Sequence, residues 1–160
     1  MNYYIYINKE NITANHRLAA EEYIKRLSAY CNVMLNTSTG IPFSKESVKS
    51  GRSILIVDRG MSTYSSDEFS QYIERKQLSG ISTIIVTIGY RKSDILSYLQ
   101  NSSHNENNNN LSISYDNNLP GIIDNISISA ANLSVQTTTV LFLEQLYRGY
   151  TIIQGKTYHK

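Results

Sequence analysis

The end of the chain joins a predicted helix to side chains that can carry charge and protons. Glu144 and Arg148 lie four residues apart, in the acid-first order that favours a pair on a helix surface. The chain then ends on Tyr158, His159 and Lys160. An imidazole exchanges protons near neutral pH, so His159 is a candidate proton carrier, although a terminal histidine is often simply exposed. A helix that only fills a core does not need this ending.

Three predicted strands end in residues that can line a ligand site. Asp58 precedes Arg59 and Gly60, Gly89 follows a run of β-branched residues, and the last strand ends at Ser129. Ligands of open parallel sheets bind outside the carboxyl ends of the strands. Gly89 has no Cβ and would let a flat ligand approach the backbone, although a glycine here can also serve only to make a turn. These residues predict that a ligand binds at this edge of the sheet, but they do not identify the ligand.

The sequence lacks several known chemical signatures, and their absence excludes some classes of function. The sequence has no phosphate-binding Walker loop, dinucleotide glycine fingerprint, nucleophile elbow or metal-ligand spacing. Cys31 is the single cysteine, which excludes an internal disulfide and a thiolate zinc cluster. We expect its side chain to be buried as a small apolar group.

The composition is that of a soluble globular protein. Hydrophobic residues make up 41% and charged residues 18% of the chain, and no apolar run approaches the roughly 20 residues of a membrane-spanning helix. The first residues show no basic region and no small-residue cleavage site, so we expect a cytosolic location. A net charge of +2 is a weak indication of an anionic partner.

The elements that must position these residues alternate between strands and helices. With 160 residues, we expect a single domain over residues 1–160. Apolar periodicity predicts strands over 2–7, 33–35, 53–58, 82–88 and 125–129, helices over 13–30, 65–78, 93–99 and 137–150, and a helical turn within 44–50. This order predicts an α/β layered domain with a largely parallel sheet.

Two local patterns refine this outline. Ser65 and Glu68 form a capping box, in which each side chain satisfies an amide of the other, at the start of a predicted helix. Residues 101–118 contain eight asparagines and little apolar content, so they read as a flexible insertion.

Several spaced segments resemble the RlmH family, SPOUT-class methyltransferases that act on a pseudouridine of large-subunit ribosomal RNA. They are Glu22–Tyr30, Asp58–Gly60 with Ser65–Phe69, and Leu143–Arg148 with the terminal Tyr158–Lys160. The matches occur in the family's order and span nearly the whole chain. The resemblance implies a SPOUT fold, in which the C-terminal part is threaded into a trefoil knot, and a homodimer without a membrane segment or a metal.

The resemblance also implies the reactants and the residues that meet them. S-adenosylmethionine would be the methyl donor, and ribosomal RNA or the assembled ribosome the partner. The cofactor-binding positions that it implies are Ile56, Gly89, Ile128, Ser129, Ala130, Ala131, Asn132 and Leu133. It implies functional roles for Glu144 and Arg148, with Arg148 on RNA phosphate or supporting the fold, and for Tyr158 and His159 at the target base.

The chain departs from the family pattern near the predicted cofactor loops. Tyr90 stands where the family has a second glycine, Ser134 and Val135 stand where it has Pro-His, and Thr139 stands where it has an arginine. Two hypotheses follow. Either the chain is an active RNA methyltransferase, or it is a silent dimeric relative that keeps RNA or ribosome contact without donor binding.

Overall fold

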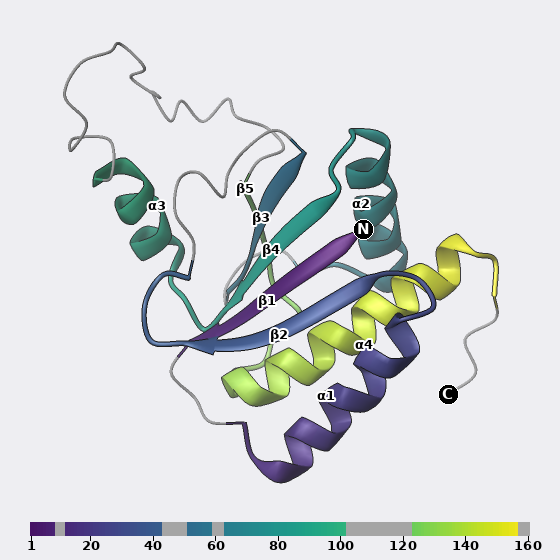
Figure 1. The fold of residues 1–160 in the computed structure, drawn as a ribbon, viewed down its shortest axis with the longest axis horizontal. Coiled ribbons are helices and arrows are strands. Elements are labelled where there is room, and N and C mark those ends of the chain that lie inside the picture. The colour runs from purple at the N-terminus through teal and green to yellow at the C-terminus, as the bar shows by residue number, and fades with distance from the viewer. Residues whose placement is uncertain (9–11, 43–50, 59–62, 102–122, 157–160) are drawn as a thin grey trace.

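The computed structural model describes residues 1–8, 12–42, 51–58, 63–101 and 123–156. In this part of the chain, strands and helices alternate around one sheet (Figure 1). The elements are β1 (Asn2–Asn8), α1 (Ala14–Leu27), β2 (Asn32–Ser38), β3 (Arg52–Val57), α2 (Ser66–Leu78), β4 (Thr83–Ile88), α3 (Lys92–Asn101), β5 (Ile123–Ile126) and α4 (Val135–Ile153). No helix among the described residues is long and apolar enough to cross a membrane.

The sheet has five strands in the order β2-β1-β4-β3-β5, and every pair is parallel. This confirms the predicted α/β fold with a parallel sheet. Because the strands are parallel, their carboxyl ends meet at one edge of the sheet. Residues that follow β3, β4 and β5 therefore become neighbours, although they are far apart in sequence.

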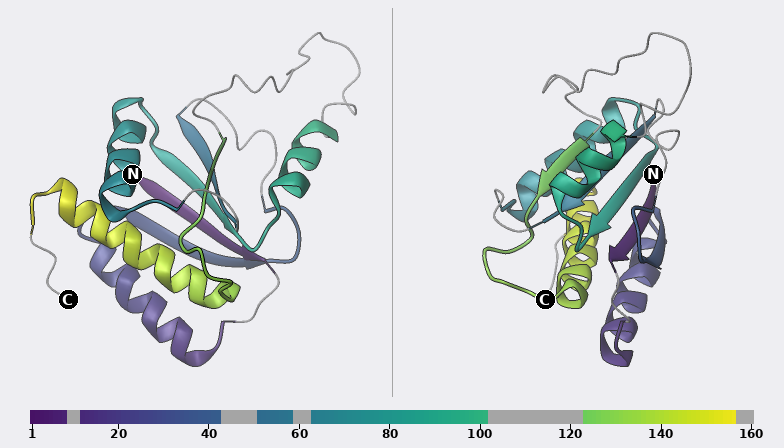
Figure 2. Two further views of the ribbon diagram at one scale, coloured as in Figure 1. Left: turned by 180° about the vertical axis from the view of Figure 1, so that it is seen from behind. Right: turned by 90° about the vertical axis from the view of Figure 1, so that its left-hand side faces the viewer.

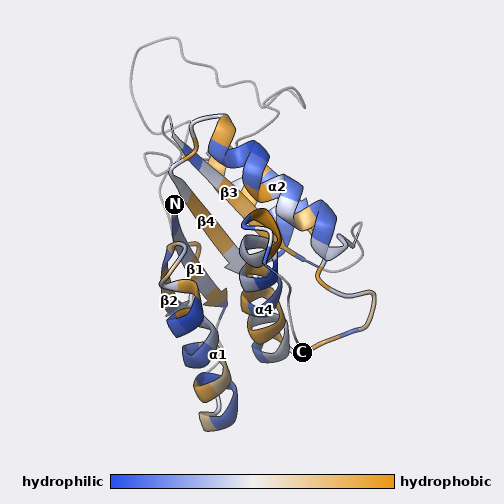
Figure 3. Cartoon of the chain, turned by 90° about the vertical axis from the view of Figure 1, so that its right-hand side faces the viewer, coloured by the Kyte–Doolittle hydropathy of each residue, from blue (hydrophilic) through white to orange (hydrophobic). Residues whose placement is uncertain are grey.

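Helices cover the two faces of the sheet unequally (Figures 1 and 3). α1, α2 and α4 lie over one face, where buried side chains such as Ile5, Leu55 and Val86 form the larger core with Phe142 and Leu146 of α4. On the other face, α3 packs over a smaller cluster that includes buried isoleucines of β3 and β4. The strands β3 and β4 are largely apolar, whereas α2 carries many hydrophilic residues (Figure 3). This is the pattern expected for strands buried on both faces under amphipathic helices.

Two elements of the C-terminal region differ from their predicted bounds. We predicted a strand over 125–129, but β5 spans Ile123–Ile126. Its partner β3 ends at Val57, so the ladder between the two strands stops at Ile126. The next residue, Ser127, forms only an isolated parallel bridge with Thr63, and its Oγ donates to the carbonyl of Ser129. α4 begins at Val135 rather than 137, because the Ser134 hydroxyl caps it by accepting from Thr137 N.

Two elements of the N-terminal half also differ from their predictions, since β2 extends over Asn32–Ser38 rather than 33–35, and α1 ends at Leu27 rather than at 30. Three local predictions are confirmed or lie outside the described residues. The capping box is present, with Ser65 N donating to Glu68 Oε2 at 2.8 Å, and these hydrogen bonds lower the pKa of Glu68. Cys31 is buried, and burial raises the pKa of its thiol to about 11, which does not suit a nucleophile. The predicted turn at 44–50 and the Asn-rich insertion, apart from Asn101 at the end of α3, lie outside the described residues.

Candidate functional site

A cavity of about 250 Å³ opens at the edge where β3, β4 and β5 end. Its wall is formed by the carboxyl ends of β3 and β4, by the loop after β5 and by the first turn of α4. The lining residues are Val57, Asp58, Ile88, Gly89, Tyr90, Arg91, Ser127, Ile128, Ser129, Ala131, Leu133, Val135 and Thr138. The cavity thus lies where ligands of open parallel sheets bind.

Gly89 holds the position at which β4 turns toward the cavity. Its φ of +82° is a left-handed conformation that side chains with a Cβ rarely adopt. A Cβ built on Gly89 would lie only 2.8 Å from Val135 Cγ2, and Asn8 Nδ2 donates to the Gly89 carbonyl at 2.9 Å. Glycine is therefore required for the turn and for the close approach of α4. Val135 fills the space that we expected to be open on this side of Gly89.

The loop after β5 supplies most of the predicted cofactor-binding residues. Ile128, Ser129, Ala131 and Leu133 line the cavity. Within the loop, Ala131 N donates to Ser129 Oγ at 3.0 Å, while Ser127 Oγ donates to the Ser129 carbonyl at 2.8 Å. These bonds hold the loop in a compact turn. The predicted sites Ala130 and Asn132 lie in the same loop, are exposed and are not part of the cavity wall.

Ile56 occupies a different place from the other predicted cofactor residues. Its side chain is completely buried in the cluster under α3. The next residue, Val57, lines the cavity. Because side chains alternate along a strand, Ile56 can contribute to a ligand at this edge only through its backbone.

Tyr90 is the cavity residue that sequence reasoning treated only as a departure from the family pattern. Its side chain is buried, and its hydroxyl donates to the carbonyls of Ser38 and Gly40 at 3.2 and 3.1 Å. Burial raises the pKa of this phenol, so the hydroxyl remains a donor at neutral pH. Tyr90 therefore ties the chain after β2 to the cavity wall.

Other cavity residues were also missed. Val57, Ile88 and Arg91 adjoin strand ends, and that position in the sequence is a signal that would have found them. Thr138 has no such signal, because it reaches the cavity only through the packing of α4. The cavity joins apolar walls to a carboxylate at Asp58 and a guanidinium at Arg91.

The predicted catalytic residues lie away from this cavity. Glu144 and Arg148 are in the later turns of α4, about 9 and 15 Å along the helix from Thr138. The Glu144 carboxylate accepts from Gln145 Nε2 at 2.7 Å, and the Arg148 carbonyl accepts from Thr151 Oγ1 at 2.8 Å. Tyr158 and His159 lie outside the described residues. Within the described residues, no group of three His, Cys, Asp or Glu side chains is placed to hold a metal ion.

Comparison with known proteins identifies relatives of the whole chain. A family profile described as a predicted SPOUT methyltransferase matches residues 119–159. Ribosomal RNA large subunit methyltransferase H 1 of Thermoanaerobacter sp. (strain X514) is 27% identical over 161 residues, covering 100% of both chains. Ribosomal RNA large subunit methyltransferase H of Porphyromonas gingivalis (strain ATCC 33277) is 30% identical over 159 residues, which cover 88% of this chain and 87% of that protein.

A third relative, ribosomal RNA large subunit methyltransferase H of Flavobacterium psychrophilum, is 29% identical over 163 residues, which cover 91% of this chain and 90% of that protein. The similarity therefore includes the strands, the cavity loop and α4 together. On these comparisons, the chain belongs to the family of ribosomal RNA large subunit methyltransferase H, of the SPOUT class, as a divergent member.

Proposed function

We propose that this protein is an S-adenosylmethionine-dependent methyltransferase that modifies a pseudouridine of large-subunit ribosomal RNA. The observation that carries the proposal is the cavity at the strand ends, whose wall includes Gly89 and most of the loop from Ser127 to Leu133. The relatives that cover the whole chain are named as ribosomal RNA large subunit methyltransferases. Because ribosomes are the proposed substrate, we place the protein in the cytosol.

The residues of the cavity suit this methyl donor. Val57, Ile88, Ile128 and Leu133 offer apolar walls for a flat heteroaromatic ring. The Asp58 carboxylate can accept hydrogen bonds from hydroxyl groups, and backbone groups of the loop can bond to ring edges whatever the side chains are. When bound, S-adenosylmethionine supplies a methyl group activated by its sulfonium centre.

The chain's own contribution to the reaction would be mainly positioning. The cavity wall orients one reactant and excludes water from it, and holding two reactants in line can supply much of the rate acceleration. Methylation of a pseudouridine ring nitrogen also requires the loss of its proton. We propose that the proton is accepted in the region of Tyr158 and His159, since imidazole is the side chain best suited to proton transfer near neutral pH. Arg148 would contact RNA phosphate or support the fold, and Glu144, in the preceding turn of α4, would pair with it on the helix surface.

The geometry of α4 supports a role for these tail residues at the cavity of another subunit. α4 runs away from the strand carboxyl ends, so its two termini lie at opposite edges of the sheet (Figure 2). Lys156 N donates to the Thr151 carbonyl at 2.9 Å, which fixes Lys156 at the last turn. At most about 10 Å of extended chain separates His159 from Lys156. Thr138, at the cavity, is about 20 Å up the helix from Thr151.

We therefore propose a homodimer in which each tail completes the cavity of its partner. The proposal includes two further features that the family resemblance implies. These are the threading of the C-terminal part into a trefoil knot, and one domain over residues 1–160 that carries a flexible Asn-rich insertion at 101–118.

A second candidate function is a silent relative that keeps RNA or ribosome contact without binding the donor. Two observations favour it. Val135, which stands where the family pattern has a histidine, packs against Gly89. Tyr90, which stands where the family has a second glycine, adds an aromatic side chain to the cavity wall. Tyr90, in place of a glycine, reduces the space at the end of β4, whereas Val135, in place of a histidine, removes a polar side chain from beside Gly89.

Calorimetric titration with S-adenosylmethionine separates the two candidates. The proposed enzyme should show saturable binding of one donor per subunit, and should then transfer labelled methyl groups to ribosomes that lack the modification. The absence of donor binding by a folded dimer would contradict the proposed function and favour the silent relative. A change of Tyr158 and His159 to Phe and Ala that left ribosome methylation unaffected would exclude the tail from the reaction.

A further inference from the structure

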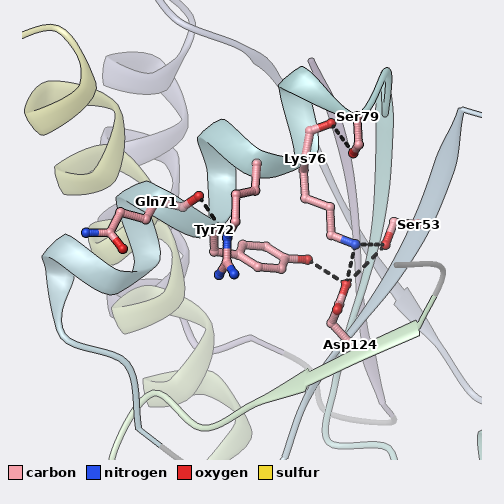
Figure 4. Close-up of polar contacts among 7 residues, drawn as sticks. Ser53, Gln71, Tyr72, Lys76, Ser79 and Asp124 are labelled. Atoms are coloured by element: carbon pink, nitrogen blue, oxygen red, sulfur yellow. Dashed lines mark hydrogen bonds and ion pairs between the residues drawn. The ribbon is translucent and has the colours of Figure 1, made fainter. Parts of the chain in front are cut away.

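A buried polar cluster joins β5 to β3 and α2 beneath the larger helical layer (Figure 4). Lys76 Nζ lies 2.6 Å from Asp124 Oδ2 and donates to Ser53 Oγ at 3.0 Å. The Tyr72 hydroxyl donates to the same carboxylate oxygen at 3.1 Å, and Ser53 Oγ donates to it at 3.3 Å. One carboxylate oxygen on β5 thus receives donors from three side chains on two other elements.

Stability alone is a weak explanation for this cluster. Lys76 is only 6% exposed, and Ser53 is completely buried. The Asp124 side chain is half-buried, with 28% exposure. Removing the lysine and part of this carboxylate from water is costly, and an apolar pair of similar volume is often equally or more stabilising. The best-supported use of such buried groups is to specify one register among several. Burial, with the charge of Asp124, raises the pKa of Tyr72, so its hydroxyl remains a donor at neutral pH.

β5 is a strand whose register needs such a device. It has four residues and pairs with β3 alone among the described strands, and one isolated bridge, from Ser127 to Thr63, follows it. Its apolar pattern is poor, since Ile123 packs on the α3 side whereas Ile126 joins the larger core. A shift by one residue would exchange the faces of every side chain in β5, and would take Asp124 away from α2.

The register of β5 determines where the cavity loop begins. Ser127 follows Ile126 directly, and the loop from Ser127 to Leu133 forms much of the cavity wall. A shift by one residue would displace the start of this loop by about 3.3 Å. It would also change which of the loop's side chains face the cavity.

We propose that Asp124, held by Lys76 and Tyr72, is a positioning residue that fixes the register of β5 and thereby places the donor-binding loop. The identity of the donor rests on the proposed function. The role of Asp124 in fixing the register of β5 is independent of it. The three side chains act through the loop backbone and do not touch the ligand themselves.

The test compares single variants with an apolar double variant. Lys76→Met and Asp124→Leu each leave one partner of the pair behind, and each should lower the melting temperature by roughly 5–10 °C. The double variant K76M/D124L removes both charges, so its melting temperature should recover most of this loss. A small deficit should remain, because the Tyr72 and Ser53 hydroxyls lose their carboxylate acceptor. The affinity of the double variant for S-adenosylmethionine should nevertheless stay roughly five- to tenfold weaker, because fewer molecules hold the loop in its binding position.

Hydrogen exchange provides a readout that needs no ligand. Amides of residues 123–133 should exchange faster in the double variant, measured well below its melting temperature. Leu27→Ala is the matched control, because Leu27 is completely buried in α1, a helix that packs mainly on α4 and β2 rather than on α2 or β5. Leu27→Ala should lose about as much stability as the single variants of the cluster. Its donor affinity and the hydrogen exchange of its β5 amides should remain those of the wild type.

The outcomes are distinguishable. Wild-type affinity together with wild-type exchange in the double variant would show that the cluster only adds stability, and would overturn the proposal. If the wild-type protein binds no donor, the proposed function fails instead. Faster exchange in β5 of K76M/D124L would then still support the register role, and unchanged exchange would exclude it.

Discussion

The two ends of α4 are built on different principles. Its N-terminal end approaches the sheet through backbone geometry, with the Ser134 cap and Val135 packed against the positive-φ Gly89. Its C-terminal end packs through aromatic side chains. Tyr150 stacks on Tyr30 with ring centroids 5.8 Å apart and meets Tyr3 edge-on at 6.4 Å.

This difference separates ligand binding from stability along one helix. At the N-terminal end, the Val135 side chain packs against Gly89 and both residues line the cavity, so small changes there should alter donor binding. At the C-terminal end, changes should alter stability without altering the cavity of the same subunit. The tail beyond that end should affect only the partner's cavity. Each prediction below tests one part of this contrast.

Gly89→Ala should have the largest effect. A Cβ at this position would meet Val135 Cγ2 at 2.8 Å and would also strain the φ of +82°. We expect a loss of about 2–4 kcal/mol in the free energy of unfolding, measured by urea titration, together with a loss of detectable donor binding.

Gly80→Ala is the matched control for this change. Gly80 has a similar φ of +78°, but a Cβ there would meet nothing within 4 Å. It should cost only about 1 kcal/mol and leave donor binding intact. Equal effects of the two variants would show that backbone strain, not the contact with α4, explains the need for glycine at position 89.

Mixed dimers should show whether the tail serves the partner's cavity. Thr138→Trp fills the cavity from α4, and His159→Ala removes the candidate proton carrier. Each variant alone should be inactive. Random co-assembly should restore about a quarter of wild-type methylation of ribosomes, because half of the dimers are mixed and each has one intact site.

The same mixture tests the opposite arrangement. If the tail served its own subunit, every site in a mixed dimer would contain one damaged part, and activity would stay at the level of the single variants. Tagged mixed dimers, purified before the assay, exclude poor co-assembly as the cause of a negative result.

Tyr150→Phe should affect stability alone. The Tyr3 and Tyr150 hydroxyls lie 3.2 Å apart in the core, and Tyr3 is 1% exposed. Removing one hydroxyl should cost about 1–2 kcal/mol, because the other loses a buried partner. The double variant Y3F/Y150F should be closer to the wild type than Y150F, as measured by urea unfolding. A change in donor affinity in either variant would contradict the separation of the two ends of α4.

The fold followed from the sequence because its signals are local and repeated. β-branched runs such as Ser82–Ile88 identified the central strands, and the Ser65–Glu68 pattern identified the start of α2. The errors lie where a tertiary partner decides the outcome. β5 ends early because the ladder with β3 stops at Val57, and the alternation of Ile126 and Ile128 in the sequence could not show this.

The candidate site could be predicted only in part. The rule on strand ends and the family resemblance together found Gly89 and the loop residues that line the cavity. Neither could show that Val135 would fill the space beside Gly89, or that Tyr90 would bond to carbonyls after β2. Such contacts join residues far apart in the chain, and they cannot be predicted from local patterns in a single sequence. The Lys76 cluster has the same origin, since it depends on the register of an edge strand.

Cys31 provides the smallest test, and it concerns the C-terminal end of α4. Its thiol is buried in the larger core beside Tyr150, and burial raises its pKa from the ordinary 9.0 to about 11. A raised thiol pKa means that the folded state holds its proton more tightly than the unfolded state. This contribution to stability is therefore complete below about pH 9 and is lost as the pH rises toward 11.

Cys31→Ala should remove this part of the alkaline loss, so its melting temperature should fall less steeply than that of the wild type between pH 9 and 11. Cys31 also contributes to the raised pKa of Tyr150, so the difference between the two pH profiles reports the thiol together with its coupling to that tyrosine. Parallel profiles would mean that the thiol ionises as easily in the folded chain as in the unfolded one. Donor affinity at pH 8 should be the same in both proteins, because Cys31 packs with the far end of α4 and not with the cavity at its first turn.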